Sequence, residues 1–241
     1  GKKILSLYGI SVTREEITSS FDEAITIAEQ IGYPVALKIV SPDILHKTEA
    51  GGLVLNIKNG SELVNAYNLI QERVRSHYKT DRIRGVLVQK MASPGVEVIL
   101  GMKKDPQFGP IILFGVGGIF VEVFKDVARR FPPICESDAY EMLKEIKGYK
   151  VLQGARTKKE YDIEALVNAI TNFSTLCIEN IDLIEEIDIN PLIVGEKGMG
   201  VCAVELTKAA LAFGLSPNDP QVESDQFKQA VENVEAARRA R

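Results

Sequence analysis

The sequence predicts an α+β fold with two lobes. Amphipathic helical segments alternate with short apolar strands in the first part of the chain, whereas strands follow one another from about residue 84 to 134. This mixed order is typical of α+β proteins. The strand "RGVLVQKM", at 84–91, is the expected division between the lobes, and no Pro- or Gly-rich linker marks it. We therefore expect domains at 1–90, 91–213 and a helical tail at 214–241.

The elements follow from hydrophobic periodicity and capping residues. Ser20 followed by Glu23 predicts a capping box for a helix that ends at Gly32. The tail is predicted as a helix over 223–241, because its apolar residues recur at helical spacing. Its stripe consists of Phe227, Ala230, Val231 and Val234. Further helices are expected at 61–76, 138–147 and 160–180, with strands at 11–17, 33–40, 52–57, 84–91, 96–105, 109–118, 119–134, 183–194 and 200–206.

Composition narrows the class of protein. The 241 residues carry 29 Lys and Arg against 33 Asp and Glu, a net charge of −4, which argues against nucleic-acid binding through a broad basic surface. Three cysteines without zinc-ligand spacing indicate reduced thiols and a cytoplasmic protein. No signal peptide and no membrane-spanning run is recognised, so no membrane association is expected.

The last predicted hairpin offers hard oxygen ligands. In "EEIDINP", Glu186, Asp188 and Asn190 fall on one face of a strand. A turn centred between residues 197 and 198 places Asn190 opposite Glu205 on the returning strand. Directly paired side chains lie about 5 Å apart at Cβ, a separation that suits Mg²⁺. The alternative is a solvated polar face on an edge hairpin.

Positive charges and one histidine mark further candidate sites. Lys38 shares its strand face with the apolar Ala36 and Val40 in "PVALKIV", which favours an anionic partner such as phosphate. The alternative is that the side chain reaches solvent at a strand edge. Arg129 and Arg130 fall on opposite faces of a strand, so one of them is expected to point inward. That arginine would bind phosphate oxygens or form an internal salt bridge with Asp or Glu. The "GVGG" segment at 115–118 matches no nucleotide-binding fingerprint. His46 lies on a polar loop that is followed by Gly51 and Gly52. Such a histidine could act as an acid, a base, a ligand or a covalent phosphoryl carrier, and the alternative is an ordinary loop residue.

Three blocks together resemble a known family. They are the run from residue 23 to 57 with "ILHKTEAGG", the run "GVEVILGMKKDPQFGPIILFGVGGIFVEVFKDVARRFPP" and "EIDINPLIV". They look like the ATP-grasp β subunits of ADP-forming acyl-CoA synthetases, in particular archaeal acetate–CoA ligases. Succinyl-CoA synthetase β subunits are similar but more distant. The resemblance covers roughly residues 4–206 and implies an ATP-grasp fold of two α/β lobes with nucleotide bound between them.

The resemblance implies a role for each matching residue. His46 is the residue that would carry a phosphoryl group from a CoA-binding α subunit to ADP. Lys38 and Arg130 would bind nucleotide phosphates, Gln89 and Met91 would lie near adenine, and Glu97 would lie in the nucleotide site. Mg²⁺ would be held by Asn190, Glu205 and Asp188. ATP and ADP would be substrates, and the assembly would be an α₂β₂ heterotetramer.

Two departures qualify the resemblance. The family commonly reads "AVDAR" where this chain has "AVELT", so Glu205 keeps the carboxylate and Thr207 replaces an arginine. The tail from about residue 214 falls outside the family pattern. The rival interpretations are a ligase for succinate or another carboxylate, a regulatory nucleotide-sensing ATP-grasp module, and a structural scaffold.

Overall fold

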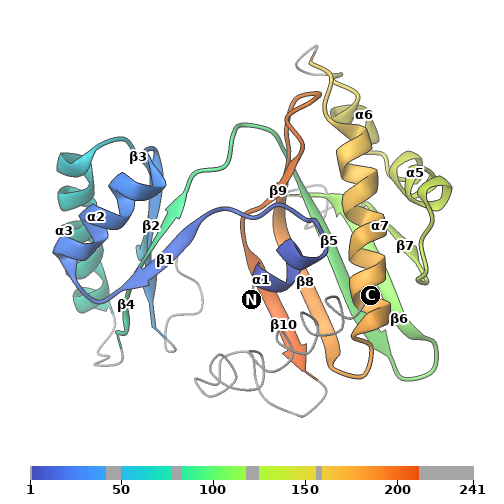
Figure 1. Ribbon diagram of the computed structural model, residues 1–241, viewed down its shortest axis with the longest axis horizontal. Helices are drawn as coiled ribbons and strands as arrows, with labels where there is room; N and C mark the ends of the chain where they lie inside the picture. The colour runs from blue at the N-terminus through green and yellow to red at the C-terminus, as the bar shows by residue number, and fades with distance from the viewer. Residues whose placement is uncertain (1, 42–49, 78–82, 118–124, 156–158, 212–241) are drawn as a thin grey trace. The chain divides into compact units, whose positions relative to one another are not determined.

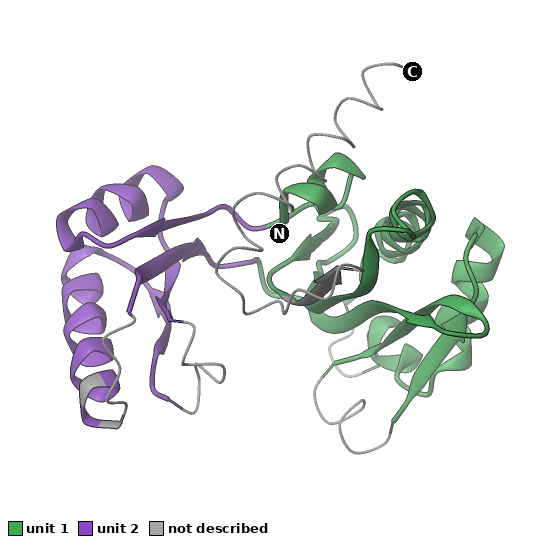
Figure 2. Ribbon diagram, turned by 90° about the horizontal axis from the view of Figure 1, so that it is seen from below, with its two compact units in different colours: residues 1–12, 93–241 green, residues 13–92 purple. Residues whose placement is uncertain are grey.

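The computed structural model describes residues 2–41, 50–77, 83–117, 125–155 and 159–211 (Figure 1). The chain forms two compact units, shown in different colours in Figure 2. Unit 2 is Thr13–Ala92, and unit 1 combines Gly1–Val12 with Ser93–Arg241. The chain passes from unit 2 back into unit 1 between Ala92 and Ser93, within two residues of the division expected after residue 90. The first twelve residues, however, group with the second half of the chain. The structure describes none of the tail beyond residue 211.

Unit 2 is an antiparallel sheet with two helices on one face (Figure 1). The strand order is β1-β4-β2-β3, and every neighbouring pair is antiparallel. Val35, Leu37 and Ile39 point into the core beneath the helices, as the alternation in the sequence predicts. The elements are β1 (Glu15–Thr18), α2 (Phe21–Ile31), β2 (Val35–Val40), β3 (Leu53–Ile57), α3 (Gly60–His77) and β4 (Gly85–Lys90).

The start of α2 follows the predicted cap with one difference. The Ser20 hydroxyl accepts the Glu23 N–H at 3.4 Å, and Gly32 ends the helix with φ +82°. The Glu23 carboxylate does not return to the Ser20 N–H; it accepts the Thr18 hydroxyl, whose oxygen accepts the Ser20 N–H at 2.9 Å. The Thr18 hydroxyl therefore lies between the Ser20 N–H and the Glu23 carboxylate, and it takes the place of the direct contact of a capping box.

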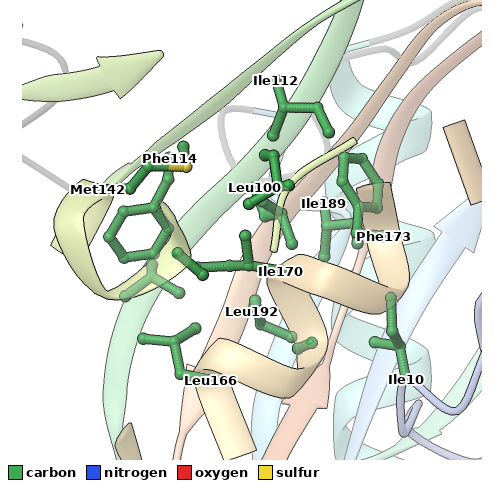
Figure 3. Close-up of a cluster of buried hydrophobic side chains, with 14 of the residues drawn as sticks. Ile10, Leu100, Ile112, Phe114, Met142, Leu166, Ile170, Phe173, Ile189 and Leu192 are labelled. Carbon is green, nitrogen blue, oxygen red and sulfur yellow. The ribbon is translucent and has the colours of Figure 1, made fainter. Parts of the chain in front are cut away.

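Unit 1 is a six-stranded antiparallel sheet packed against helices. The order is β10-β8-β5-β6-β7, and β9 also pairs with β8. Side chains from β5, β6 and β8 interlock with α7, as with Leu100, Phe114 and Ile189 against Ile170 and Phe173 (Figure 3). The elements are α1 (Lys2–Leu7), β5 (Val96–Asp105), β6 (Gly109–Val116), β7 (Val127–Arg130), α5 (Glu136–Glu145), α6 (Tyr149–Leu152), α7 (Ile163–Glu179), β8 (Ile184–Val194), β9 (Val201–Ala203) and β10 (Leu206–Leu211).

None of the helices in the described ranges has the length and apolarity needed to cross a bilayer. The helices instead pack in the two hydrophobic cores. The cysteines in these ranges are all free, with Cys135 exposed, Cys177 buried and Cys202 partly buried. This state agrees with the reduced thiols that the sequence indicates.

Asp162 connects the first turn of α7 to the β8–β9 turn. Its carboxylate accepts N–H groups from Ala165 at 3.1 Å and from Gly198 and Gly200 at 2.9 Å each. Burial raises the pKa of Asp162, but the backbone N–H donors outweigh it, and the pKa lies below its ordinary value. One side chain thus caps a helix and fixes the turn from which β9 returns along β8.

Replacing Asp162 by Ala should lower the free energy of unfolding by about 1–2 kcal/mol at pH 7, because a helix cap is lost. The folded pKa is depressed, so the stabilisation is full above the unfolded pKa of about 3.9 and disappears as the pH falls through the folded value. Urea denaturation of both proteins should show a difference that shrinks below about pH 4. The exposed Asp182→Ala serves as control. An equal difference at pH 3 and pH 7 would contradict this role.

Candidate functional site

Strand β8 presents a polar face away from the core of unit 1. Ile187 and Ile189 are buried, Glu186 and Asp188 are half-buried, and Asn190 is exposed. This alternation matches the prediction up to Asn190. Beyond it the order changes, because Leu192 and Val194 are the next buried residues.

A β-bulge at Asn190 and Pro191 explains the change. Leu100 of β5 pairs with Ile189, and Val98 pairs with Leu192, so two residues of β8 oppose one residue of β5. A bulge of this kind bends the strand and redirects a side chain. Here it lets both halves of β8 face the core while Asn190 stays exposed. The signal in the sequence is the change of spacing between apolar residues in "IDINPLIV".

The hairpin register is the predicted one. Leu192 pairs with Ala203 and Val194 with Val201, and the Glu196 carbonyl accepts the Met199 N–H at 2.8 Å across the turn. The Asn190 N–H donates to the Glu205 carbonyl at 3.1 Å. Asn190 is therefore opposite Glu205, as expected. The β8–β10 register shifts just beyond this point, between Leu206 and Lys208.

Gly101 gives the Asp188 carboxylate room on the neighbouring strand. The two residues pair between β5 and β8, and a Cβ at position 101 would lie 3.1 Å from Asp188 Oδ1. Asp188, Asn190 and Glu205 thus bring carboxylate and amide oxygens to one stretch of the sheet, which is the donor chemistry that Mg²⁺ prefers. Within the described ranges, no three His, Cys, Asp or Glu side chains are grouped as a metal site.

Glu97 lies exposed near the start of β5, opposite Ile193 of β8. Its carbonyl accepts the Gly117 N–H at 2.8 Å, which fixes the end of β6 against the start of β5. A Cβ at position 117 would lie 3.2 Å from that carbonyl oxygen, so glycine allows the close approach. Part of the "GVGG" segment therefore packs directly on the backbone of Glu97.

The two arginines of β7 point to opposite faces of the sheet. Arg130 pairs with the buried Ile112, and its Nη1 donates to the Glu145 carboxylate at 2.7 Å. This contact is the internal salt bridge that the sequence left open as an alternative. Arg129 pairs with Leu113 instead and is exposed. The structure therefore places Arg130 toward helix α5 rather than beside Asp188.

Lys38 lies on the face of the unit 2 sheet opposite to its helices. The residue is only 5% exposed, and its neighbours across the sheet are Leu87 on β4 and Leu53 on β3. Burying an ammonium costs free energy, because the charged form loses its hydration. Its burial on an inner strand disfavours the alternative of a lysine that reaches solvent at a strand edge.

Gln89 is on the same face as Lys38, one position diagonally along β4. It pairs with Ala36, is 2% exposed, and its Nε2 donates to Thr13 Oγ1 at 3.0 Å and to Glu15 Oε2 at 2.6 Å. Met91 follows β4, is half-buried, and its N–H donates to the Pro34 carbonyl at 3.1 Å. The structure thus brings Lys38, Gln89 and Met91 together around β2 and β4.

His46 falls in residues 42–49, outside the described ranges. The chain on either side of this segment is anchored: the Ile39 N–H donates to the Gly52 carbonyl at 2.8 Å, and Ala50 is buried. Gly51 has φ +66°, and a Cβ there would lie 2.7 Å from Arg73 Cδ. The positive φ favours glycine at position 51, and any larger residue there would displace the Arg73 side chain.

Comparison with known proteins gives consistent matches. Residues 1–207 match the model of the ATP-grasp domain family. The chain is 47% identical over 204 residues to the β subunit of acetate–CoA ligase (ADP-forming) II of Pyrococcus furiosus, covering 85% of this chain and 86% of that protein. It is 46% identical over 201 residues to acetate–CoA ligase (ADP-forming) I of Archaeoglobus fulgidus, covering 83% of this chain but 29% of that longer protein.

Solved structures agree with the sequence matches. The chain is similar to an acetyl-coenzyme A synthetase of Candidatus Korarchaeum cryptofilum, with a TM-score of 0.74, 41% identity, and coverage of 87% of this chain and 89% of that one. That protein is in complex with coenzyme A and Mg-AMPPCP, and its phosphohistidine segment points towards the nucleotide-binding site. All strands described above except β10, which ends at Leu211, lie within residues 1–207.

Gln89→Glu should destabilise unit 2 in a pH-dependent manner, because two carboxylates would then face each other at Glu15. The new group is buried, so its folded pKa rises above the unfolded value of about 4.3, and stability falls as the pH rises. We expect a loss of about 2–4 kcal/mol at pH 7 and recovery toward pH 4.5, measured by urea denaturation. Gln89→Met removes the same hydrogen bonds without adding charge and should show no such slope. A flat profile for Gln89→Glu would refute the prediction.

Proposed function

Because the chain belongs to the ATP-grasp family, and within it to the ADP-forming acetate–CoA ligase β subunits, we propose that it is the nucleotide-binding subunit of such an enzyme. The reaction is acyl-CoA + ADP + phosphate ⇌ carboxylate + ATP + CoA. The observation that carries the proposal is the stretch of β8 that is rich in side-chain oxygens. Asn190 lies opposite Glu205, and Asp188 pairs with Gly101 on the neighbouring strand. It lies inside the region that matches the ATP-grasp model.

Asn190, Glu205 and Asp188 are proposed to hold Mg²⁺. Their oxygens fit a hard cation, and one similar protein has been solved with Mg-AMPPCP. The ion supplies positive charge that offsets the charge of the phosphate oxygens. The chain's own contribution is to fix the ligands: the bulge exposes Asn190, Gly101 leaves space for Asp188, and the hairpin register brings Glu205 alongside.

Lys38, Gln89, Met91 and Glu97 are proposed to line the nucleotide site. The buried Lys38 ammonium would meet phosphate oxygens in a setting of low dielectric, where its charge acts most strongly. Arg130 is part of the same proposal, but it would have to exchange its Glu145 partner for phosphate. Gln89 is held in place by Thr13 and Glu15, so its position is set before any ligand binds.

His46 is the proposed phosphoryl carrier. An imidazole nitrogen attacks phosphorus of the partner's phosphoryl donor, forming an N–P bond as the donor's bond to phosphorus breaks. A terminal oxygen of ADP then attacks phosphorus, an O–P bond forms, and the imidazole leaves with its electron pair. The support is the resemblance of the "ILHKTEAGG" segment and the phosphohistidine segment named for a similar protein.

A partner subunit follows from the β-subunit names of the relatives and from the longer single-chain relative, of which this chain spans 29%. We propose that the partner binds CoA and forms the acyl phosphate, in an α₂β₂ assembly. A cytoplasmic location belongs to the same proposal and is supported by the free cysteines in the described ranges.

His46→Ala should abolish ATP formation from acyl-CoA, ADP and phosphate in the complex with its partner, since no other group on this chain is proposed to carry the phosphoryl group. Labelled ATP should also phosphorylate the wild-type protein in an acid-labile manner and leave the variant unlabelled. The chain holds one other histidine, so His77→Ala is the matched control. Turnover at the wild-type rate in His46→Ala would end the carrier proposal.

The paired variant Asn190→Ala with Glu205→Ala should weaken Mg²⁺-dependent binding of ADP at least tenfold, because metal ligands are removed. Isothermal titration with and without magnesium measures this loss directly. Asn168→Ala, an exposed asparagine on α7, is the control and should bind as the wild type does. Unchanged affinity in the paired variant would refute the metal site while leaving the His46 proposal open to its own test.

A further inference from the structure

The unit 1 sheet has a core face and an outer face, because successive side chains of a strand alternate. On β6 and β7, Phe114 and Ala128 pair with each other and are buried in the core. Leu113 and Arg129 form the adjacent pair and therefore lie on the outer face. Leu113 is half-buried and Arg129 is exposed. Arg129 is thus the arginine of β7 on the outer face, and Arg130 lies on the core face.

Arg129 lies in the same row of the sheet as the proposed metal ligand Asp188. The strands β8, β5, β6 and β7 follow one another across the sheet (Figure 1). Asp188 pairs with Gly101 on β5. Gly101 in turn pairs with Leu113 on β6, and Leu113 pairs with Arg129 on β7. A Cβ at position 101 would lie 3.1 Å from Asp188 Oδ1, so the carboxylate leans over the glycine, in the direction of Arg129.

The separation along this row suits a bridging anion and is too long for a direct ion pair. Three strand steps of about 4.8 Å place the Cα atoms of Asp188 and Arg129 roughly 14 Å apart. An arginine side chain of six bonds, each about 1.5 Å long, covers about half of that distance. A phosphate group held by a metal ion at Asp188 would occupy the remainder, with oxygens directed at the guanidinium.

Neighbouring charges distinguish Arg129 from the cations around it. Lys103, on the outer face of β5, pairs with Glu186 of β8, so a carboxylate lies opposite it. Arg130 donates to the Glu145 carboxylate at 2.7 Å. Within the described ranges, the Arg129 guanidinium makes neither a hydrogen bond nor an ion pair. Its charge and its N–H donors are therefore available to an anionic ligand.

We propose that Arg129 binds the outermost phosphate of the nucleotide, at the opposite end of the row from Asp188. This inference rests on the proposed nucleotide and metal site, and it adds a residue that the resemblance to the family does not single out. A guanidinium offers two parallel N–H donors to phosphate oxygens and offsets their charge on the side away from the metal ion. Arg129 does so without giving up a carboxylate partner, whereas Arg130 would have to release Glu145.

Arg129→Gln should lower the affinity for Mg-ADP about tenfold or more, because a charge-assisted contact with phosphate is lost. The affinity for AMP, which lacks the outer phosphate, should not change. Isothermal titration of the full chain, alone and with its partner subunit, measures both nucleotides in the presence of magnesium. Arg129→Lys should recover part of the loss, since it keeps the charge but not the two parallel donors.

Lys144→Gln is the matched control for the loss of one positive charge from unit 1. Lys144 is exposed in the last turn of α5, and this variant should bind Mg-ADP as the wild type does. Unchanged affinity for Mg-ADP in Arg129→Gln would overturn the inference and leave the proposed function standing. An equal loss for ADP and AMP would also overturn it, as would a loss seen in Arg130→Gln but not in Arg129→Gln. Failure of the wild type to bind Mg-ADP in either form would instead refute the proposed function itself.

Discussion

The fold of unit 1 depends on strand β8, which has partner strands on both of its sides. This strand is hydrogen-bonded to β5 on one side and to β9 and β10 on the other, so most of its length is fixed from two directions. A regular strand could not bury Ile189 and Leu192 on the same face, because side chains alternate. The bulge at Asn190 and Pro191 resolves this conflict, and it does so where the proposed metal ligand is exposed.

Unit 2 places polar side chains where a purely structural sheet would place apolar ones. Lys38 and Gln89 are both almost fully buried on the face that the two helices leave free. Gln89 is satisfied by Thr13 and Glu15, so its burial costs little. Lys38 pairs across the sheet with leucines of the two neighbouring strands, and we propose that its ammonium binds nucleotide phosphate. These polar residues of unit 2 are thus a buried lysine and a buried glutamine, whereas those of β8 in unit 1 are carboxylates and an amide.

Local signals in the sequence predicted much of this arrangement, and contacts between distant residues account for what they missed. The Ser20 cap, the alternation of β2 and the Asn190–Glu205 register depend on neighbours or on one short turn, and the structure shows all three. The hydrogen bond from Thr18 to Glu23 could not be predicted in this way, because it depends on where strand β1 lies relative to helix α2. The partner of Arg130 is Glu145 on another element, and nothing in "DVARRFPP" identifies it. Likewise, the grouping of residues 1–12 with the second half of the chain rests on tertiary packing.

That grouping has a consequence for how the protein is made. All the strands and helices of unit 2 lie between Thr13 and Ala92, so this unit can fold as soon as that stretch has left the ribosome. Tyr8, just after helix α1, precedes unit 2 in the chain but lacks its partners until α7 is synthesised, since its hydroxyl donates to Glu179 and accepts the Asn180 amide N–H. These contacts join residues 171 and 172 positions apart, so this segment can reach its native place only late in the synthesis of the chain.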